Sequence, residues 1–395
     1  MDEPTAIRIN NVTIYTEEDV LHNHSLLIEN GKIAEITPEH EADNRVKAEV
    51  RQLDGEGLNL IPGFIDGHIH GAGGADVMDA SAEALDTIAF ELPQEGTTSF
   101  LATTITQSVK NIEKALKNIK NYQSKPGAAE MLGVHLEGPY IEESKAGAQP
   151  KEYIIEPNLE QFTYWQALSG QQIKTITIAP EHDETGEFMQ HLHRTGINVS
   201  AGHTGTDYAG MKTAVTQGVR QVTHLCNAMS GIHHRGIGVV GAAFQLDELR
   251  SEVIADGIHI VPEMLQLIYD HIGSDRIILI TDAMRAKSLE PGNYELGGQP
   301  VIVTDDRAVL KSGSLAGSIL KMDDGVRNML SLQGVTFSNI IKMASVNPAK
   351  QIGVFDRKGS IAENKDADLL LVDDEMNIKC TISRGVITKK QNKVG

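Results

Sequence analysis

The chain has 395 residues, which is long enough for two domains or for one large α/β barrel with an appendage. Its formal net charge of −19 argues against a nucleic-acid partner, because binding to phosphates requires a basic surface. The two cysteines, Cys226 and Cys380, exclude a disulfide framework and a cysteine-based zinc module. Residues 1–10 lack the basic start and apolar core of a secretory signal, and no apolar run reaches the ~18 residues of a membrane span. We therefore expect a cytoplasmic enzyme without a membrane partner.

Both ends of the chain are predicted to form short β-strands. Residues 6–16 and 25–37 are rich in Ile, Val and Thr, and residues 367–372 near the other end have the same composition. No helical periodicity interrupts either end. We expect residues 1–58 and 354–395 to be the two halves of one small β-sandwich domain.

The middle of the chain, residues 59–353, alternates short apolar runs with longer segments of helical pattern. Repeated strand–helix units predict parallel strands, and eight of them close naturally into a TIM-type (β/α)8 barrel. An open doubly wound sheet is the alternative, but neither G-x-G-x-x-G nor a P-loop sequence supports it. The eight runs are residues 58–65, 98–103, 131–136, 173–179, 197–201, 221–225, 253–255 and 277–280.

Most of these runs lead into residues that can bind metal or move protons, and a barrel assembles its site at such strand ends. His68 and His70 follow the first run, and alternate residues of a strand point the same way, so both imidazoles can face one ion. Taken alone, the pair can equally be two surface histidines. Glu137 ends the third run and can bridge two cations. His135 lies one step deeper, and we expect it to be a core residue or to support a ligand.

The later runs add two histidines and a carboxylate. His203 and His224 end the fifth and sixth runs, and Asp282 follows the eighth. A single histidine at a strand end is more often structural, but this combination favours a metal site. Asp282 can also be a helix N-cap, although its neighbours favour a catalytic role. Cys226 is expected to be a small buried hydrophobe.

Imidazoles and carboxylates without a thiolate cluster suit zinc or iron, with manganese as a further candidate. The four histidines, Glu137 and Asp282 suffice for two divalent ions per subunit. Two such ions polarise a carbonyl and lower the pKa of a water molecule. The set therefore predicts hydrolysis of an amide or a similar bond.

The motifs in this order resemble the amidohydrolase superfamily and, within it, the deacetylases of N-acetylglucosamine 6-phosphate. The resemblance rests on His68-x-His70, residues 135–139 (HLEGP), 202–204 (GHT), 256–259 (DGIH) and 315–317 (LAG), and it runs from about residue 58 to 349. It implies removal of acetate from the 2-acetamido group to give glucosamine 6-phosphate. It also implies the split β domain and a homodimer.

The resemblance assigns roles residue by residue. It implies that Glu137, His203 and His224 hold one metal, and His68 and His70 lead us to expect a second. Asp282 matches the general base that takes a proton from the attacking water and returns it to the leaving amine. Substrate contacts are expected at Ala148, Gln149, Asn227, Ala228, His234, Arg235, His259, Leu315, Ala316 and Gly317.

Two of these positions need comment. Several members of the family carry a histidine where this chain has Gln149, and Gln149 can donate a neutral hydrogen bond but cannot become cationic. In those members the histidine polarises the amide carbonyl of the substrate, and in this chain the second metal is expected to do so. Residues 233–235 (HHR) are the best candidate for binding the substrate's phosphate, since Arg235 can grip it through two hydrogen bonds. The loop can act in its own or in the neighbouring subunit, and a chance basic cluster is the plain alternative.

Four other functions stay open on the sequence. One is deacetylation of N-acetylgalactosamine 6-phosphate, which differs in the geometry at one hydroxyl. Another is a different amidohydrolase, for example one that acts on a cyclic amide. The third is a metal-free scaffold on the same barrel, although every expected ligand position is filled. The fourth is a glycoside hydrolase, which would need two opposed carboxylates and no metal.

Overall fold

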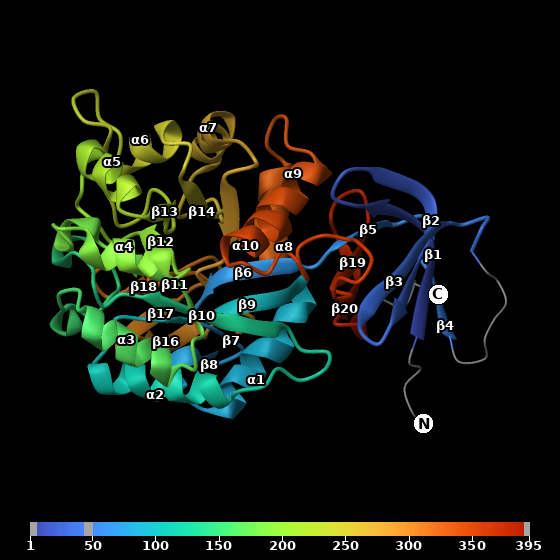
Figure 1. Ribbon diagram of the computed structural model, residues 1–395, viewed down its shortest axis with the longest axis horizontal. Helices are drawn as coiled ribbons and strands as arrows, with labels where there is room; N and C mark the ends of the chain where they lie inside the picture. The colour runs from blue at the N-terminus through green and yellow to red at the C-terminus, as the bar shows by residue number, and fades with distance from the viewer. Residues whose placement is uncertain (1–5, 43–49, 391–395) are drawn as a thin grey trace.

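The computed structural model describes residues 6–42 and 50–390 and contains a large α/β body beside a smaller β body (Figure 1). Residues 1–5, on which the expected absence of a secretory signal partly rests, lie outside the described residues. Eight parallel strands form one sheet in sequential order, as the alternating pattern predicts. They are β6 (Phe64–Ile69), β9 (Thr97–Thr104), β10 (Glu130–Glu137), β11 (Ile173–Ile178), β12 (Asn198–Ala201), β13 (Val219–Val222), β14 (Arg250–Ile254) and β15 (Ile277–Ile280).

The sheet closes into a barrel between β15 and β6. Just beyond β15, the backbone N–H of Asp282 donates to the carbonyl of His68 at 2.8 Å, and Ala283 forms a parallel bridge with Ile69. The TIM-type barrel is therefore confirmed. Its closure brings the first and last strands, and the polar residues at their ends, side by side.

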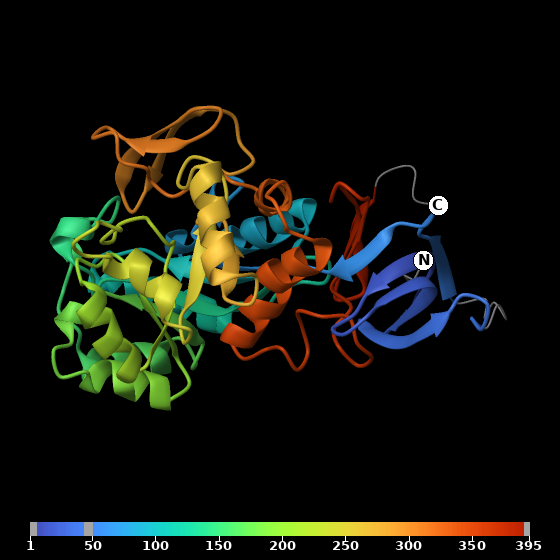
Figure 2. The same ribbon diagram turned by 90° about the horizontal axis from the view of Figure 1, so that it is seen from above.

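Helices lie around the outside of the barrel (Figures 1 and 2). In α2, Ile112, Ala115, Leu116 and Ile119 are buried at a helical spacing, and Ser108 caps the N-terminus. The helices are α1 (Ala82–Glu91), α2 (Val109–Asn121), α3 (Leu159–Leu168), α4 (Glu187–Arg194), α5 (Tyr208–Thr216), α6 (Gly238–Gln245), α7 (Pro262–Ile272), α8 (Met322–Leu330), α9 (Phe337–Ile341) and α10 (Asn347–Gln351). None of the helices in residues 6–42 and 50–390 combines the length and apolar character needed to cross a membrane.

The smaller body is one sheet built from both ends of the chain, as predicted. Its two parts enclose a single apolar core, to which Ile9 and Leu26 contribute from one end and Leu369 and Ile382 from the other. The strands, in order across the sheet, are β21 (Val386–Lys390), β20 (Ile378–Ser383), β19 (Leu369–Val372), β5 (Asn59–Pro62), β1 (Ala6–Tyr15), β2 (Val20–Glu29) and β3 (Lys32–Pro38), with β4 (Val50–Asp54) also paired to β1.

Two features differ from the predicted strands. The run at residues 58–65 is divided, because β5 pairs with β1 and β19 in the smaller sheet and only the part from Phe64 belongs to the barrel. The division falls at Gly63, where a side chain would collide with Thr98. The second feature is an unpredicted three-stranded sheet of β16 (Gly292–Leu296), β17 (Gln299–Val303) and β18 (Ala308–Leu310). It projects from the barrel beyond β15 (Figure 2). A two-stranded ribbon, β7 (Gly71–Ala72) and β8 (Ala75–Asp76), follows β6.

Candidate metal centre and active site

A cavity of about 350 Å³ opens at the carboxyl ends of the barrel strands, where the sequence places the polar residues. Three of these residues lie just after their strands in the left-handed backbone region: His203 at φ 46°, His224 at φ 31° and Asp282 at φ 49°. Non-glycine residues rarely adopt this conformation, and it is concentrated at functional sites. Here the backbone turns sharply at the strand ends, and the three side chains line the cavity.

Glu137, His203 and His224 form the first cluster of the site. Glu137 Oε1 lies 3.2 Å from His203 Nε2 and 3.2 Å from His224 Nε2, and the two nitrogens are 3.1 Å apart. Ligand atoms around a tetrahedral ion lie about 3.3 Å apart when each metal–ligand distance is ~2.0–2.1 Å. The three atoms therefore have the mutual spacing of ligands around one divalent ion.

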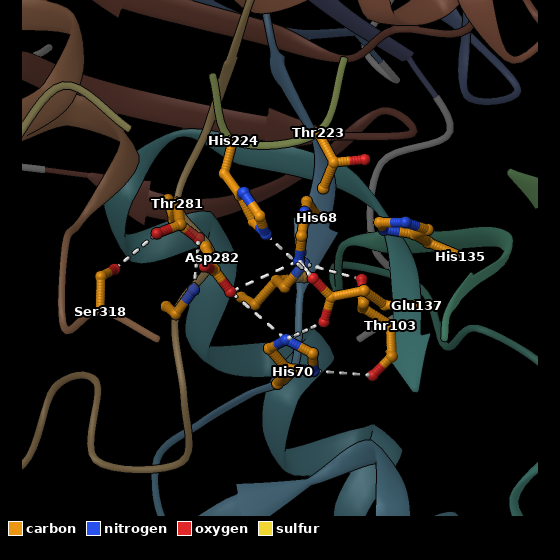
Figure 3. Close-up of polar contacts among 12 residues, drawn as sticks. His68, His70, Thr103, His135, Glu137, Thr223, His224, Thr281, Asp282 and Ser318 are labelled. Atoms are coloured by element: carbon orange, nitrogen blue, oxygen red, sulfur yellow. Dashed lines mark hydrogen bonds and ion pairs between the residues drawn. The ribbon is translucent and has the colours of Figure 1, made fainter. Parts of the chain in front are cut away.

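His68, His70 and Asp282 form the second cluster, which lies beside Glu137 and His224 of the first (Figure 3). Asp282 Oδ1 is 3.4 Å from His68 Nε2 and 3.3 Å from His70 Nε2. Glu137 contacts this cluster too, with Oε2 at 3.3 Å from His70 Nε2 and Oε1 at 3.5 Å from His68 Nε2. Glu137 thus lies between the two clusters, where one carboxylate can serve both.

The proton positions also fit a metal site. His203 Nδ1 lies 2.8 Å from the carbonyl of Lys145, and His70 Nδ1 lies 3.3 Å from that of Thr103. A carbonyl only accepts, so each Nδ1 carries the hydrogen and each neutral ring keeps its lone pair on Nε2. These lone pairs face the carboxylate oxygens of Glu137 and Asp282. Between these nitrogens and the carboxylate oxygens there must be positive charge, carried either by a proton on Nε2 or by a bound metal ion.

The pKa shifts of the site residues also indicate that positive charge stabilises the two carboxylates. Burial alone would raise the pKa of Glu137, but His68, His203 and the other imidazoles outweigh it and hold that pKa well below its usual value. Burial likewise opposes ionisation of Asp282, yet His68 and His70 lower its pKa to about 2. Burial would lower the pKa of His68, but Asp282, Glu137 and Glu252 raise it to about 9. Both carboxylates are therefore ionised at neutral pH.

Most of the residues predicted for the site meet at this cavity. His68 is fully buried behind the lining, and Ala316 is also buried, with Leu315 and Gly317 on either side of it at the wall. His234 and Arg235 lie outside the lining, in an exposed turn where they contact each other at 2.6 Å. The predicted residues that line the cavity are His70, Glu137, Ala148, Gln149, His203, His224, Asn227, Ala228, His259, Asp282, Leu315 and Gly317.

Gln149 and His259 are each held by a carboxylate. Gln149 Nε2 donates to Glu137 Oε2 at 2.6 Å, and its Oε1 accepts the backbone N–H of Thr106 at 2.7 Å. His259 Nδ1 lies 2.6 Å from Asp256 Oδ2. Gln149 is therefore positioned to orient the carboxylate that lies between the two clusters.

Other residues at the site were not predicted from the sequence. Lys145 lines the cavity and its Nζ donates to the carbonyl of Met229 at 3.2 Å; its only signal in the sequence is its closeness to Ala148. Leu296 reaches the cavity from the unpredicted sheet. The remaining additions are Ile105, Ser144, Gly147 and Ser314. Cys226 is not in the lining, and burial raises the pKa of its thiol to about 12, so it stays protonated.

Comparison with known proteins agrees with this geometry. Residues 59–388 match the amidohydrolase family, and residues 9–58 match the family described as the NagA composite domain. The chain belongs to the amidohydrolase family.

Within that family the chain is similar to N-acetylglucosamine-6-phosphate deacetylases. It is 45% identical to the enzyme of that name from Bacillus subtilis (strain 168), over 97% of each chain. The crystal structure of N-acetylglucosamine-6-phosphate deacetylase from Pasteurella multocida superposes with a TM-score of 0.90 at 31% identity, covering 97% of this chain and 99% of that one. An N-acetylgalactosamine-6-phosphate deacetylase from Escherichia coli O157:H7 is 35% identical, over 93% of this chain and 95% of its own.

Proposed function

We propose that the protein hydrolyses the acetamide of N-acetylglucosamine 6-phosphate, releasing acetate and glucosamine 6-phosphate. The observation that carries the proposal is the meeting of four imidazoles with Glu137 and Asp282 around one cavity. The full-length similarity to deacetylases of this substrate supports the same reaction. Glucosamine is favoured over galactosamine because identity to the glucosamine enzymes is 45% and 43%, against 35% for the galactosamine enzyme.

The site is proposed to hold two divalent metals per subunit, zinc or iron in the first place and manganese as a further candidate. Glu137, His203 and His224 would hold one, and His68, His70 and Asp282 the other, with Glu137 shared. When bound, such ions lower the pKa of a water molecule and polarise a carbonyl group. All six residues are buried, with at most 8% of any one of them exposed, which limits the access of bulk water to the ligand atoms.

Asp282 is proposed to carry the proton through the reaction. Its lowered pKa keeps it ionised, so it can take a proton from the attacking water. It then returns this proton to the amine of the sugar, which cannot leave as an anion. Its side chain lines the cavity, within reach of a bound substrate, while its backbone is fixed between His68 and Ser318.

The substrate is proposed to lie along the cavity wall formed by Ala148, Gln149, Asn227, Ala228, His259 and residues 315–317. Arg235 and His234 do not reach this wall in a single chain. Their position outside the lining supports a homodimer in which the loop at 233–235 binds the phosphate in the neighbouring subunit.

The same proposal extends to the organisation of the chain. Residues 59–353 would be the catalytic domain, and residues 1–58 with 354–395 the supporting β domain. The reaction and its amino-sugar phosphate are small-molecule metabolism, for which a cytoplasmic location is proposed.

Acetate release from a panel of 2-acetamido sugars, with and without a 6-phosphate, tests this function directly. The assay is run before and after dialysis against a chelator, and again after Zn²⁺ or Fe²⁺ is restored. We expect activity on N-acetylglucosamine 6-phosphate above its galactosamine isomer, loss on chelation and recovery with metal. Full activity after complete metal removal would refute the proposal.

A further inference from the structure

A buried carboxylate, Glu252, lies directly behind the second cluster and is not part of the cavity lining. It stands on β14, and 2% of the residue is exposed. Its Oε2 is 3.1 Å from His68 Nδ1 and accepts the backbone N–H of His224 at 3.3 Å. Its Oε1 accepts Gln221 Nε2 at 2.6 Å. Three hydrogen-bond donors therefore converge on the two oxygens of one carboxylate.

The contact with His68 decides which nitrogen of that ring carries the hydrogen. An ionised carboxylate only accepts, so His68 Nδ1 must donate and the lone pair of the neutral ring lies on Nε2. His68 Nε2 is buried, makes no hydrogen bond to the described residues, and faces Asp282 and Glu137. His70 and His203 obtain the same arrangement from backbone carbonyls. His68 obtains it from a side chain, which a substitution can change.

We propose that Glu252 is a positioning residue that holds His68 in the Nδ1–H form and so sets the affinity of the cluster His68–His70–Asp282 for a divalent metal. This rests on the proposed metal-dependent function. A carboxylate that accepts from a metal-binding imidazole fixes the orientation of the ring and raises the basicity of its other nitrogen. By accepting the N–H of His224, Glu252 also holds the backbone of a residue in the first cluster.

The same residues could be taken for a third metal site, since ligand atoms of His68, His135 and Glu252 lie within 4.8 Å of one another. His68 would then have to give both ring nitrogens to metals, which requires loss of its last proton. The Nε2 of His135 is engaged with the hydroxyl of Thr177 at 2.7 Å, and its Nδ1 makes no hydrogen bond to the described residues, so the case against a third ion rests on His68. The ring of His135 lies edge-on to His68, with centroids 4.5 Å apart and planes at 90°. His135 thus packs against the ring that Glu252 orients, and a hydrogen bond explains this cluster without a further ion.

A chain of amides leads away from Glu252 through the barrel and holds it in place. Gln221, which donates to Glu252, accepts Asn198 Nδ2 at 3.0 Å through its Oε1. Asn198 in turn accepts a hydrogen bond from Gln351, whose own Oε1 accepts from Arg250 at 2.8 Å. Every link pairs a donor with an acceptor, so the position of the Glu252 oxygens is determined by more than local packing.

The substitution Glu252→Gln tests the proposal, because an amide cannot serve all three donors. If its oxygen faces His68 and His224, its NH₂ meets the NH₂ of Gln221. If the oxygen of the new amide faces Gln221, the NH₂ of that amide meets His68 Nδ1. This favours the tautomer of His68 that carries its hydrogen on Nε2. We expect one of the two metal equivalents to bind about 10- to 100-fold more weakly. Co²⁺ titrated into the metal-free protein, in competition with a chromophoric chelator, measures this by visible absorption.

The double variant Glu252→Gln/Gln221→Glu is the rescue. The new carboxylate at 221 accepts both from Asn198 and from the amide at 252, whose oxygen is then free for His68 and His224. We expect affinity for the second Co²⁺ to return to within a few-fold of the wild-type value, with a matching absorption spectrum. If Glu252 only stabilised the fold, moving the negative charge to position 221 on the neighbouring strand would not restore the affinity for Co²⁺.

Glu130→Gln is the matched control, since Glu130 is a partly buried carboxylate on β10 that contacts Arg357 and Lys358, outside the metal cluster. Its Co²⁺ affinities should equal those of the wild type. If Glu252→Gln does not fold, Glu252→Asp replaces it and should show the same weakening, because its carboxylate is one methylene short of His68.

Wild-type Co²⁺ affinities in a folded Glu252→Gln protein, or a folded double variant as weak as the single one, would overturn the role of Glu252. Failure of the proposed function looks different. In that case the wild-type protein itself binds no stoichiometric Co²⁺ or releases no acetate.

Discussion

The substitution Asp282→Asn is the sharpest test of the proposed chemistry, because the structure allows it to change the charge with little change in the backbone. Asp282 has φ 49°, a left-handed conformation that Asn tolerates better than most residues. Its backbone N–H and carbonyl are bound to His68 and Ser318 at 2.8 and 2.7 Å, and these bonds do not depend on the side chain. Asn also keeps an oxygen that can face His68 and His70.

The expected loss follows from what the amide lacks. An Asn side chain cannot take a proton from water at neutral pH, and it has none to return to the sugar amine. General acid–base catalysis contributes about 10²–10⁴-fold, and here one residue serves both steps, so kcat should fall by about 10³-fold or more. The first cluster, Glu137 with His203 and His224, is unchanged, so at least one metal equivalent should remain.

The measurement is kcat for acetate release together with metal content of the same sample. Asp183→Asn is the matched control. Asp183 is a buried carboxylate outside the cavity lining that accepts the backbone N–H of Met189 at 2.8 Å, and its replacement should leave kcat unchanged. If Asp282→Asn keeps kcat within tenfold of wild type with full metal content, Asp282 is not the proton carrier.

Three further predictions concern the phosphate and the stability of the fold. Arg235→Ala should raise KM for the phosphorylated substrate about 10- to 100-fold, because a charged hydrogen bond to the phosphate is lost. The KM for N-acetylglucosamine should not change, and an equal rise for both sugars would contradict a phosphate contact. Lys358→Met should lower the free energy of unfolding by about 3–5 kcal/mol in urea titrations, because the Lys358 side chain is 1% exposed and its ammonium faces Glu130, Asp366 and Asp368. A loss below ~1 kcal/mol would show that these carboxylates do not depend on Lys358. Burial opposes ionisation of Glu130, but Arg357 and Lys358 hold its pKa below 4.5 in the folded state, so its contribution is present above pH 4.5 and lost as the pH falls through the lowered value. Glu130→Gln should therefore flatten the fall in unfolding free energy between pH 5 and pH 3, and an unchanged slope would refute this.

The fold could be predicted because its signals are local. Each barrel strand is a short apolar run bounded by helical pattern, and buried parallel strands have this form in the sequence. The three-stranded sheet over residues 292–310 has no such signal, since its strands alternate buried and exposed residues over only a few positions. The division of the run at 58–65 was missed for a related reason. Both pieces are buried and mostly apolar, and it is the pairing partners, distant in the chain, that assign them to different sheets.

The site divides in the same way. His68, His203, Glu137 and Asp282 stand at strand ends, and the topology of a barrel is enough to bring strand ends together. Glu252 could not be predicted in this way, because it lies inside a strand, next to the apolar run at 253–255. The role of a carboxylate at such a position depends on hydrogen-bond partners that the sequence does not reveal. Lys145 and Leu296 belong to loops and sheets whose course is set by tertiary contacts.

Burying Glu137, Asp282 and Glu252 within one barrel end is costly unless positive charge accompanies them, and the described imidazoles are its only nearby source among the side chains of the two clusters. Protonation of those imidazoles would balance the charge but would remove the lone pairs that face the carboxylates. Divalent ions balance the charge and use the lone pairs at once. The hydrogen bonds to Thr103, Lys145 and Glu252 place a proton on the outer nitrogen of three rings, so that each Nε2 points at the carboxylates, where a divalent ion can replace a proton.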